Sequence, residues 1–255
     1  MLGAIIGDIV GSVFEFHNHR SKDFPLFCDQ STFTDDSVLT FATAKVLLDG
    51  TDYTKTYQDF SHRYAGRGYG TYFSLWLNMK NPLPYNSLGN GSAMRVSPVG
   101  FAFESAEETL AEARRSAEVT HNHPEGVKGA QATALAIFMA RKGSSQVEIK
   151  SEISSRFDYK LTRPLDEIRL VNRFDETCQG SVPEAISAFL ESASFEDAIR
   201  LAISIGGDSD TIACIAGGIA QAFYGTIPAW IASEAKMRLP LEFLQILECF
   251  EGQYF

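Results

Sequence analysis

The apolar residues of this 255-residue chain recur mostly at every third or fourth position, the spacing that places them on one face of an α-helix. This periodicity, with capping signals at the ends, predicts helices over residues 36–48, 53–64, 107–119 and 125–142, the first of them stopped by Gly50. Alternating strand patterns are almost absent. The pattern therefore predicts an all-α fold that is more globular than a simple four-helix bundle.

Two apolar segments are built from unusually small residues. In the first, Gly3, Gly7 and Gly11 recur at intervals of four and so share one stripe of a helix. Each glycine inside a helix costs roughly 1 kcal/mol relative to alanine, so three in register indicate that another backbone packs closely there. In the second, residues 209–224 are small or apolar on nearly every side and end at Gly225, which predicts a helix buried at the centre of the protein.

Three stretches interrupt the helical pattern. Residues 17–32 are polar and predict a loop, and residues 66–92 are rich in Gly, Pro and Asn and predict mostly irregular structure. Residues 150–180 carry the least information. N-capping patterns predict two further helix starts, at Ser181 (with a proline in the first turn) and at Ser194.

Composition narrows the class of protein. Hydrophobic residues make up 45% and charged residues 21% of the chain, which predicts one compact multi-helix domain over residues 1–255. A net charge of −10 argues against direct nucleic-acid binding. The four cysteines are scattered without C-x-x-C spacing, which fits a reducing cytoplasm, and the first segment is too short and too acidic for a signal peptide or membrane span.

Two acidic clusters stand where apolar helices are predicted to begin. They are Thr34, Asp35 and Asp36 in FTDDS, and Asp208, Asp210 and Thr211 in GGDSDT. Helix capping is the simpler interpretation, because Thr and Asp are favoured caps and first-turn acids complement the helix dipole. However, a cap needs one acid, and paired carboxylates at a buried helix end repel unless they are protonated or share a cation. Oxygen ligands without cysteine suit magnesium or manganese, and two such clusters could hold two ions.

Other candidate residues carry weaker signals. Asp8 lies inside an apolar segment, where burial would demand a partner, and Glu15 taken alone is typical of a surface acid. The glycine-flanked Asn90 segment can expose backbone N–H groups to phosphate, although an ordinary turn explains it as well. His121 could cap a helix, touch a phosphate or be purely structural. The aromatic residues of GYGTYFSLWL could stack on a base, although core packing is the commoner use at this spacing.

Read together, these segments resemble the ADP-ribosylglycohydrolase family from about residue 3 to residue 228. The resemblance rests on GAIIGDIVGSVFE, FTDDS, GNGSAMRVSPVG, THNHPEG and GGDSDTIACIAGGIAQAFYG, in that order. It implies an all-α fold in which the two acidic clusters together bind two Mg²⁺ or Mn²⁺ ions at one end of a cleft. It further implies catalytic roles for Glu15, Asp35 and Asp208, and substrate binding by Gly89, Asn90, Gly91, Ser92 and His121, the glycine loop lying along a diphosphate.

The activity that this resemblance implies is hydrolysis at the C1″ carbon of the distal ribose of ADP-ribose. The partner would be an ADP-ribosylated protein or an ADP-ribose-containing small molecule, with an arginine linkage as first expectation and serine-linked or O-acetyl-ADP-ribose behind it. Two alternatives remain open: a non-catalytic binding or crystallin-like structural relative, and a metal-dependent phosphohydrolase acting on the diphosphate. The intact carboxylates of both clusters count against a purely structural role.

Overall fold

The computed structural model describes all 255 residues, and its secondary structure is helical apart from one isolated β-bridge. The helices are α1 Leu2–Gly11, α2 Asp35–Asp49, α3 Tyr53–Arg63, α4 Thr71–Leu77, α5 Gly91–Met94, α6 Ser97–Ala102, α7 Ala106–Glu118, α8 Pro124–Arg141, α9 Gln146–Phe157, α10 Leu165–Val171, α11 Cys178–Leu190, α12 Phe195–Ser204, α13 Ser209–Tyr224, α14 Ala229–Lys236 and α15 Leu241–Tyr254. The prediction of an all-α fold is confirmed. No helix combines the length and the apolar character needed to cross a membrane.

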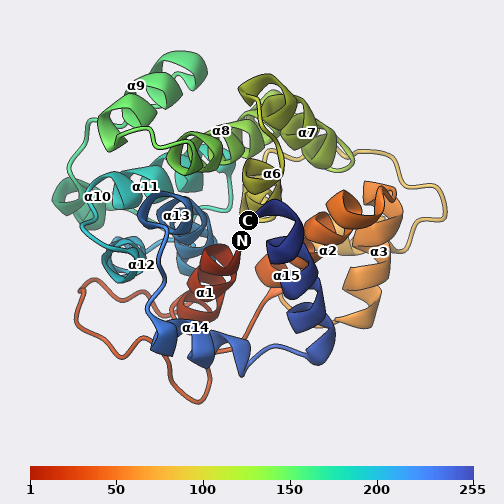
Figure 1. Ribbon diagram of the computed structural model, residues 1–255, viewed down its shortest axis with the longest axis horizontal. Helices are drawn as coiled ribbons and strands as arrows, with labels where there is room; N and C mark the ends of the chain where they lie inside the picture. The colour runs from red at the N-terminus through yellow and green to blue at the C-terminus, as the bar shows by residue number, and fades with distance from the viewer.

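Helices α1 and α13 form the centre of the molecule, with the other helices arranged around them (Figure 1). Their backbones approach so closely that side chains would not fit between them. A Cβ atom on Gly3 would lie 2.3 Å from a carbonyl oxygen of α13, one on Gly7 only 2.0 Å from the carbonyl oxygen of Ala213, and one on Gly11 2.3 Å from the Cα of Asp210. The glycine stripe of the first segment therefore lies against α13, which confirms the predicted backbone contact.

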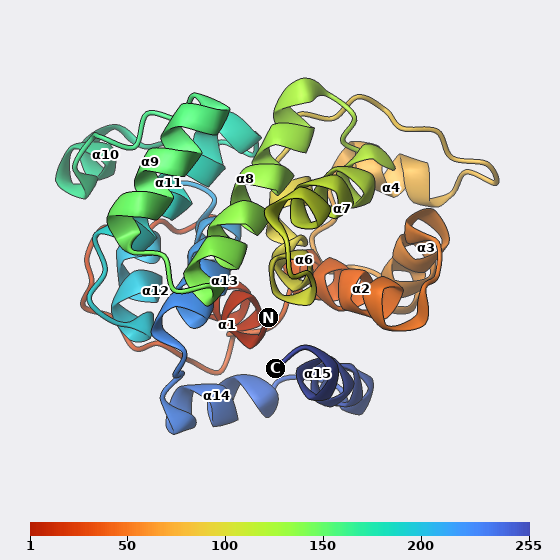
Figure 2. The ribbon, with the colours of Figure 1, turned by 45° about the horizontal axis from the view of Figure 1, so that its top comes forward.

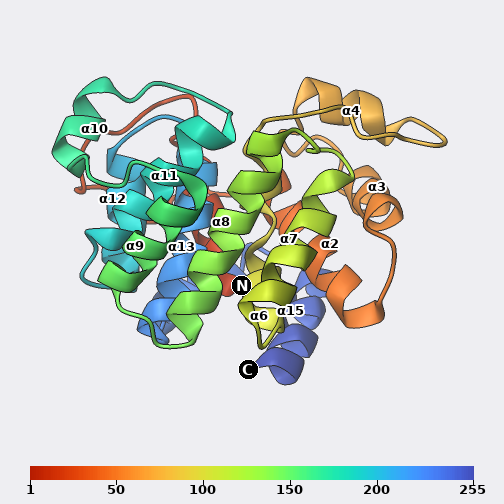
Figure 3. The ribbon, with the colours of Figure 1, turned by 90° about the horizontal axis from the view of Figure 1, so that it is seen from above.

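The remaining helices cover this pair on two sides. Helices α8, α11 and α12 pack against α13, whereas α2 lies on the other side of the centre with α3 and α15 (Figure 2). Helix α14 crosses below α1, and α7 packs on α8. Seen from above, α4 and α10 lie far apart at opposite edges of the molecule (Figure 3). The first acidic cluster lies at the start of α2 and the second at the start of α13.

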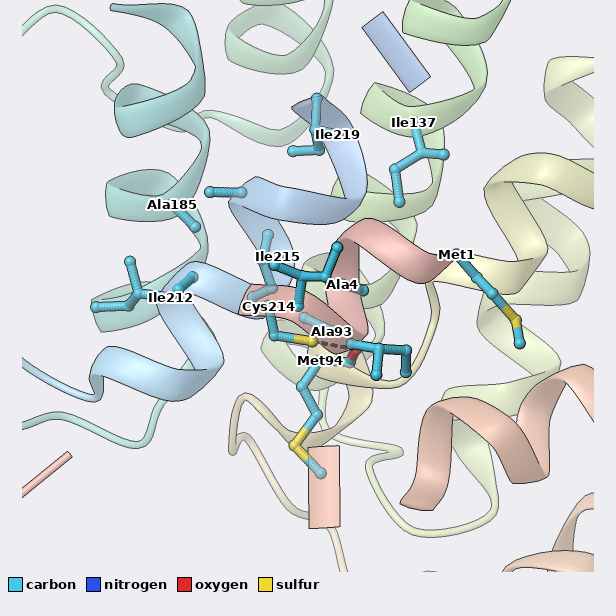
Figure 4. Close-up of a cluster of buried hydrophobic side chains, with 14 of the residues drawn as sticks. Met1, Ala4, Ala93, Met94, Ile137, Ala185, Ile212, Cys214, Ile215 and Ile219 are labelled. Carbon is cyan, nitrogen blue, oxygen red and sulfur yellow. Dashed lines mark hydrogen bonds between the residues drawn. The ribbon is translucent and has the colours of Figure 1, made fainter. Parts of the chain in front are cut away.

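A continuous core of 64 buried residues joins these helices into a single domain. Figure 4 shows one region of it, in which Cys214 and Ile215 of α13 lie beside Ala4 of α1 and Met94 of α5. The thiol of Cys214 donates a hydrogen bond to the carbonyl oxygen of Met94, at 3.3 Å. This contact ties the short helix α5 to the centre of the molecule.

Most of the helix boundaries predicted from local signals are confirmed. Helix α2 ends at Gly50, whose φ of 67° is the left-handed conformation that glycine adopts without strain. The hydroxyl of Ser194 accepts the N–H of Asp197, as predicted for the start of α12. Three other predicted helices agree with α3, α7 and α8 to within one residue at each end. Helix α13 spans the predicted range and ends at Gly225.

One prediction about local structure is wrong. Ser181 does not begin a helix: α11 starts at Cys178, capped by Thr177, and Pro183 lies inside it. The Ser181 hydroxyl instead donates to the carbonyl oxygen of Asp175, because the bridge between Gly89 and Thr177 fixes the chain before the helix. This pairing with a distant segment overrides the local capping pattern.

The segment 66–92 is mostly irregular, as predicted, apart from one short helix and the start of another. Helix α4 interrupts it because Phe73 and Trp76 are buried in the core, and their packing compensates for the surrounding Gly and Pro residues. Residues 150–180, which carried little sequence information, contain most of α9, all of α10 and the beginning of α11.

The α1–α13 contact makes a direct prediction about stability. Gly7→Ala places a methyl group against the backbone of α13, so the free energy of unfolding should fall by about 1–3 kcal/mol or more. Gly252→Ala is the matched control, because Gly252 lies in α15 with open space around its Cβ position; it should leave stability unchanged or raise it by up to about 1 kcal/mol. Urea denaturation of both variants measures the difference, and equal effects would contradict the close contact.

Candidate active site

A cleft of about 430 Å³ opens where the starts of α2 and α13 meet the loop before α5. Most of the site residues predicted from the sequence line this cleft, although they come from five separate parts of the chain. They are Glu15, Asp35, Asp36, Gly89, Asn90, Gly91, His121, Asp208, Asp210 and Thr211. The tertiary structure therefore brings together both acidic clusters, the glycine loop and the histidine.

Two of the predicted site residues have side chains that bond elsewhere. The hydroxyl of Thr34 donates to a carboxylate oxygen of Asp8, at 2.6 Å, and that of Ser92 donates to the carbonyl oxygen of Gly126, also at 2.6 Å. Neither residue lines the cleft. If these residues contribute to ligand binding, Thr34 does so by positioning its neighbours and Ser92 through its backbone.

Asp8 holds the start of α2 in place. It is fully buried and accepts hydrogen bonds from the backbone N–H and hydroxyl groups of both Thr34 and Ser37. Thr34 in turn caps α2, since its hydroxyl oxygen accepts the N–H of Asp36. Burial raises the pKa of Asp8, and these four hydrogen bonds oppose the rise. The partner that a buried Asp8 demands is thus the first turn of α2, which carries the first acidic cluster.

A turn made of two left-handed glycines positions the second cluster. Gly206 and Gly207 have φ values of 68° and 89°, which side chains other than glycine rarely adopt. The side-chain amide of Asn18 accepts from the N–H of Gly207, at 2.8 Å, and donates to its carbonyl oxygen, at 3.0 Å. This double contact fixes the turn that brings Asp208 to the N-terminal end of α13.

The acidic side chains lie close together without a positive partner. Carboxylate oxygens of Glu15, Asp208 and Asp210 all lie within 4.8 Å of one another. Burial, and then the charge of Asp210, raises the pKa of Asp35 and that of Asp36 well above the usual range. No lysine or arginine forms an ion pair with any residue of the two clusters. The cluster is therefore destabilising unless it binds protons or a cation.

The pKa of two further members reflects the same causes. Burial raises the pKa of Asp208 to about 6. Burial, followed by repulsion from Asp210 and Glu176, raises the pKa of half-buried Glu15 to about 8. Groups shifted in this direction inside a cleft are typical of functional sites.

The donor atoms fit a hard divalent cation. Oδ1 of Asp36 is buried without a hydrogen-bond partner, while Oδ2 accepts the hydroxyl of Thr211 at 3.4 Å. An oxygen-only set of carboxylates and a hydroxyl, with an unpaired buried oxygen among them, suits Mg²⁺ or Mn²⁺ better than Zn²⁺. Capping accounts for Thr34, but it does not account for the side chain of Asp208, which makes no capping hydrogen bond.

The glycine loop is attached directly to the second acidic cluster. The side-chain amide of Asn90 donates to Asp208 at 2.7 Å and to Ser181 at 2.8 Å, and its backbone N–H donates to the carbonyl oxygen of Glu176. The next two backbone N–H groups, those of Gly91 and Ser92, have no backbone acceptor within the protein. Of these two residues only Gly91 lines the cleft, so its N–H group can bind an anion a short distance from the carboxylates, whereas Ser92 is fully buried.

Aromatic residues line the cleft beyond this loop. The rings of Tyr72 and Tyr85 are nearly parallel, with centroids 6.3 Å apart, and the Tyr72 side chain is 73% exposed. Phe73 and Trp76 are buried, which agrees with the interpretation of this segment as core. Two rings of this segment therefore pack in the core, whereas the ring of Tyr72 is exposed and can stack on a flat ligand.

Among the cleft-lining residues that sequence reasoning missed, three carry polar groups that face the site: Glu176, Tyr85 and Arg95. Glu176 belongs to the stretch without recognisable pattern, and its place depends on the bridge to the glycine loop. Arg95 is the residue at the end of α5, and only its complete burial distinguishes it from a surface arginine.

Comparison with known proteins assigns the family. The family model described as ADP-ribosylglycohydrolase matches residues 1–248. The chain belongs to this family. The match covers both acidic clusters, the glycine loop and His121, so the cleft described above lies entirely within the family's domain.

Curated relatives and a solved structure agree with this assignment. The chain is 30% identical to "ADP-ribosylhydrolase ARH3" of Mus musculus, over 88% of this chain and 82% of that protein. It is 28% identical to "ADP-ribosylarginine hydrolase Tri1" of Pseudomonas putida (strain GB-1), over 92% and 73% respectively. A solved "ADP-ribosylglycohydrolase-related protein complex" shares the fold, with a TM-score of 0.72 at 23% identity over 100% of this chain and 97% of that one.

The repulsion within the cluster predicts how a neutral substitution acts. The pKa of Asp210 is raised in the folded protein, so ionisation of this carboxyl destabilises the fold. The destabilisation is absent below the pKa of an unfolded aspartate, about 4, and grows as the pH rises. Asp210→Asn should therefore raise the melting temperature of the protein in EDTA at pH 8, and raise it less at pH 4.

Thermal unfolding in EDTA at the two pH values measures this effect. Asp29→Asn, which neutralises an exposed aspartate outside any ion pair, is the control and should change little at either pH. A variant at Asp210 that melts well below the wild type at pH 8 would show that this carboxylate is a structural cap.

Proposed function

We propose that this protein is a metal-dependent hydrolase that cleaves the glycosidic bond between ADP-ribose and an acceptor, and so reverses ADP-ribosylation. The observation that carries the proposal is a single cleft in which buried carboxylates without a cation lie beside a loop with free backbone N–H groups. Membership of the family supports the hydrolase class. We further propose that residues 1–255 form one domain that works in a reducing cytoplasm, where its four free thiols persist.

Two magnesium or manganese ions would be held by the acidic clusters. The residues that we assign to them are Thr34, Asp35, Asp36, Asp208, Asp210 and Thr211. When bound, such ions neutralise the carboxylates and act as Lewis acids toward sugar hydroxyl groups and water. Of the two threonines, Thr211 has its hydroxyl in the cleft, whereas the hydroxyl of Thr34 is bonded to Asp8.

The cleft has N–H donors at one end and carboxylates at the other, which matches the diphosphate and the distal ribose of ADP-ribose. We assign the diphosphate to the loop Gly89–Gly91, because the N–H group of Gly91 lacks an acceptor within the protein and Gly91 lines the cleft; Ser92 would support this loop from its buried position. The adenine ring would stack on Tyr72 and Tyr85, the exposed aromatic part of the cleft wall. The distal ribose would then lie at the carboxylates, since Asn90 joins the loop to Asp208.

We assign catalytic roles to Glu15, Asp35 and Asp208. Glu15 is half-buried at the edge of the acidic cluster, and its carboxyl can exchange a proton with the reacting groups at C1″. Asp35 and Asp208 begin the two helices on either side of the cluster, where they can orient the ribose hydroxyl groups. Rigid helix ends suit this task because small misplacements of reacting groups are costly.

An arginine linkage is our first choice for the acceptor. Glu15 and Glu176 both line the cleft and neither forms an ion pair, so a guanidinium group would find complementary charge there. The relative named as an ADP-ribosylarginine hydrolase is consistent with this choice. Serine-linked and O-acetyl-ADP-ribose are the next candidates, and a panel of the three linkages distinguishes them.

The direct bond between Asn90 and Asp208 also supports one alternative, because it places the diphosphate loop close to the carboxylates. A phosphohydrolase would release AMP, whereas a glycohydrolase releases intact ADP-ribose. A purely binding or structural relative would release neither. Product analysis with each linkage, with and without EDTA, separates the three readings.

Glu15→Gln should lower kcat by roughly 10²–10⁴-fold, the usual contribution of a positioned acid or base, while ADP-ribose still binds. Wild-type turnover should stop in EDTA and return with Mg²⁺ or Mn²⁺. The product is quantified by chromatography and ADP-ribose affinity by calorimetry. Unchanged turnover in Glu15→Gln would remove Glu15 from the mechanism, and AMP as the product would overturn the glycohydrolase assignment.

Gly91→Val should weaken ADP-ribose binding by about tenfold or more, because a side chain here meets His121 and fills the place where a phosphate approaches the backbone. A Cβ on Gly91 would lie 3.2 Å from Nε2 of His121. Melting temperature measured alongside affinity separates loss of the site from loss of the fold. Unchanged affinity would show that the loop is an ordinary turn.

A further inference from the structure

Arg95 is a buried cation without an acidic partner. It is completely inaccessible to solvent, and no carboxylate forms an ion pair with it. Its guanidinium carbon lies 4.3 Å from the ring centre of Tyr57, and Nε and Nη1 have no hydrogen-bond acceptor. Burying a guanidinium in this way is costly, so a purely structural role for Arg95 is poorly explained.

Nη2 is the guanidinium nitrogen of Arg95 that forms hydrogen bonds, and these bonds connect Arg95 to the cleft. Nη2 donates to the carbonyl oxygen of Ser116, at 2.9 Å, and to the hydroxyl oxygen of Thr120, at 2.8 Å. The same hydroxyl oxygen lies 2.7 Å from Nδ1 of His121. Arg95, Thr120 and the His121 ring therefore form a continuous chain of hydrogen bonds that ends in the cleft.

The direction of each bond in this chain follows from the donors. A guanidinium can only donate, so Thr120 accepts from Arg95. The hydroxyl proton of Thr120 then has Nδ1 of His121 as its only neighbouring acceptor. If Thr120 donates to Nδ1, that nitrogen carries no proton and the ring proton must be on Nε2.

We propose that Arg95 and Thr120 are positioning residues that hold His121 in the tautomer with its proton on Nε2, so that the ring donates a hydrogen bond to an oxyanion in the cleft. Nε2 is the end of the ring that faces the glycine loop, 3.2 Å from the position of a Cβ on Gly91. Burial, and then the charge of Arg95, holds the pKa of His121 well below its usual range, so the ring remains uncharged.

This arrangement gives the loop a side-chain donor in addition to the free backbone N–H group of Gly91. That the oxyanion is the diphosphate of ADP-ribose rests on the proposed function. The tautomer itself does not, because it is set by Arg95 and Thr120 within the protein. Measurements on the free protein and on its complex therefore test different steps.

The first test is nitrogen-15 NMR of the imidazole in the free wild-type protein. We expect Nδ1 of His121 to resonate as an unprotonated nitrogen that accepts a hydrogen bond, and Nε2 as a protonated nitrogen. Thr120→Val keeps the shape but removes the hydroxyl, and should move Nδ1 to the position of an unprotonated nitrogen without a hydrogen bond. Thr120→Ser, which restores the hydroxyl, should return it. A protonated Nδ1 in the wild type, or no change in Thr120→Val, would overturn the proposal.

The second test uses ADP-ribose affinity, measured by calorimetry. His121→Gln places an N–H donor near the position of Nε2 and should keep most of the affinity. His121→Met fills the same space without a donor and should weaken binding by about tenfold or more, the loss expected for one hydrogen bond to a charged group. Equal losses in both variants would refute a donor role for His121. Failure of the wild type to bind ADP-ribose would instead refute the proposed function and leave the tautomer assignment standing.

Discussion

The close approach of the α1 and α13 backbones is the interaction on which the site depends. Gly3, Gly7 and Gly11 leave no room for side chains between the two helices, so the C-terminal half of α1 lies directly against the start of α13. Asp8, on that half of α1, then anchors the first turn of α2 through four hydrogen bonds. One packing contact thus brings the starts of two helices, each with paired carboxylates, to the same place.

The cluster of carboxylates at these helix starts is unfavourable in the protein without a bound cation. The carboxylates are buried and repel one another, which raises their pKa values, and no basic side chain compensates for them. A cation that binds only the folded protein would recover this energy through mass action. The stability of the surrounding core, which joins 64 buried residues, is what allows the fold to retain such a cluster.

The cleft is electrostatically divided. At one end lie the carboxylates, and at the other lie the free N–H groups of the glycine loop, the buried charge of Arg95 and the ring of His121. Asn90 connects the two ends, because its side chain donates to Asp208 while its backbone begins the loop. An elongated ligand with a diphosphate beside a hydroxyl-rich sugar matches this division better than a ligand of uniform charge, since each part meets groups of complementary character.

The sequence alone determined the features that depend on neighbours along the chain: the helical period, the cap at Ser194, the glycine stripe, and the acidic clusters at the starts of α2 and α13. The family resemblance added the interpretation that these motifs, in this order, belong to one site. Tertiary structure decided the rest, because the partners are distant in sequence. Ser181 is a poor predictor of a helix start since the bridge to Gly89 fixes the chain before it, and Glu176 reaches the cleft through the same bridge. The role of Asp8 depends on a helix that begins 27 residues later, and that of Arg95 on Thr120 and His121. Local patterns report which residues can begin or end a helix, whereas a site is formed by which helix ends meet, and only long-range packing sets that.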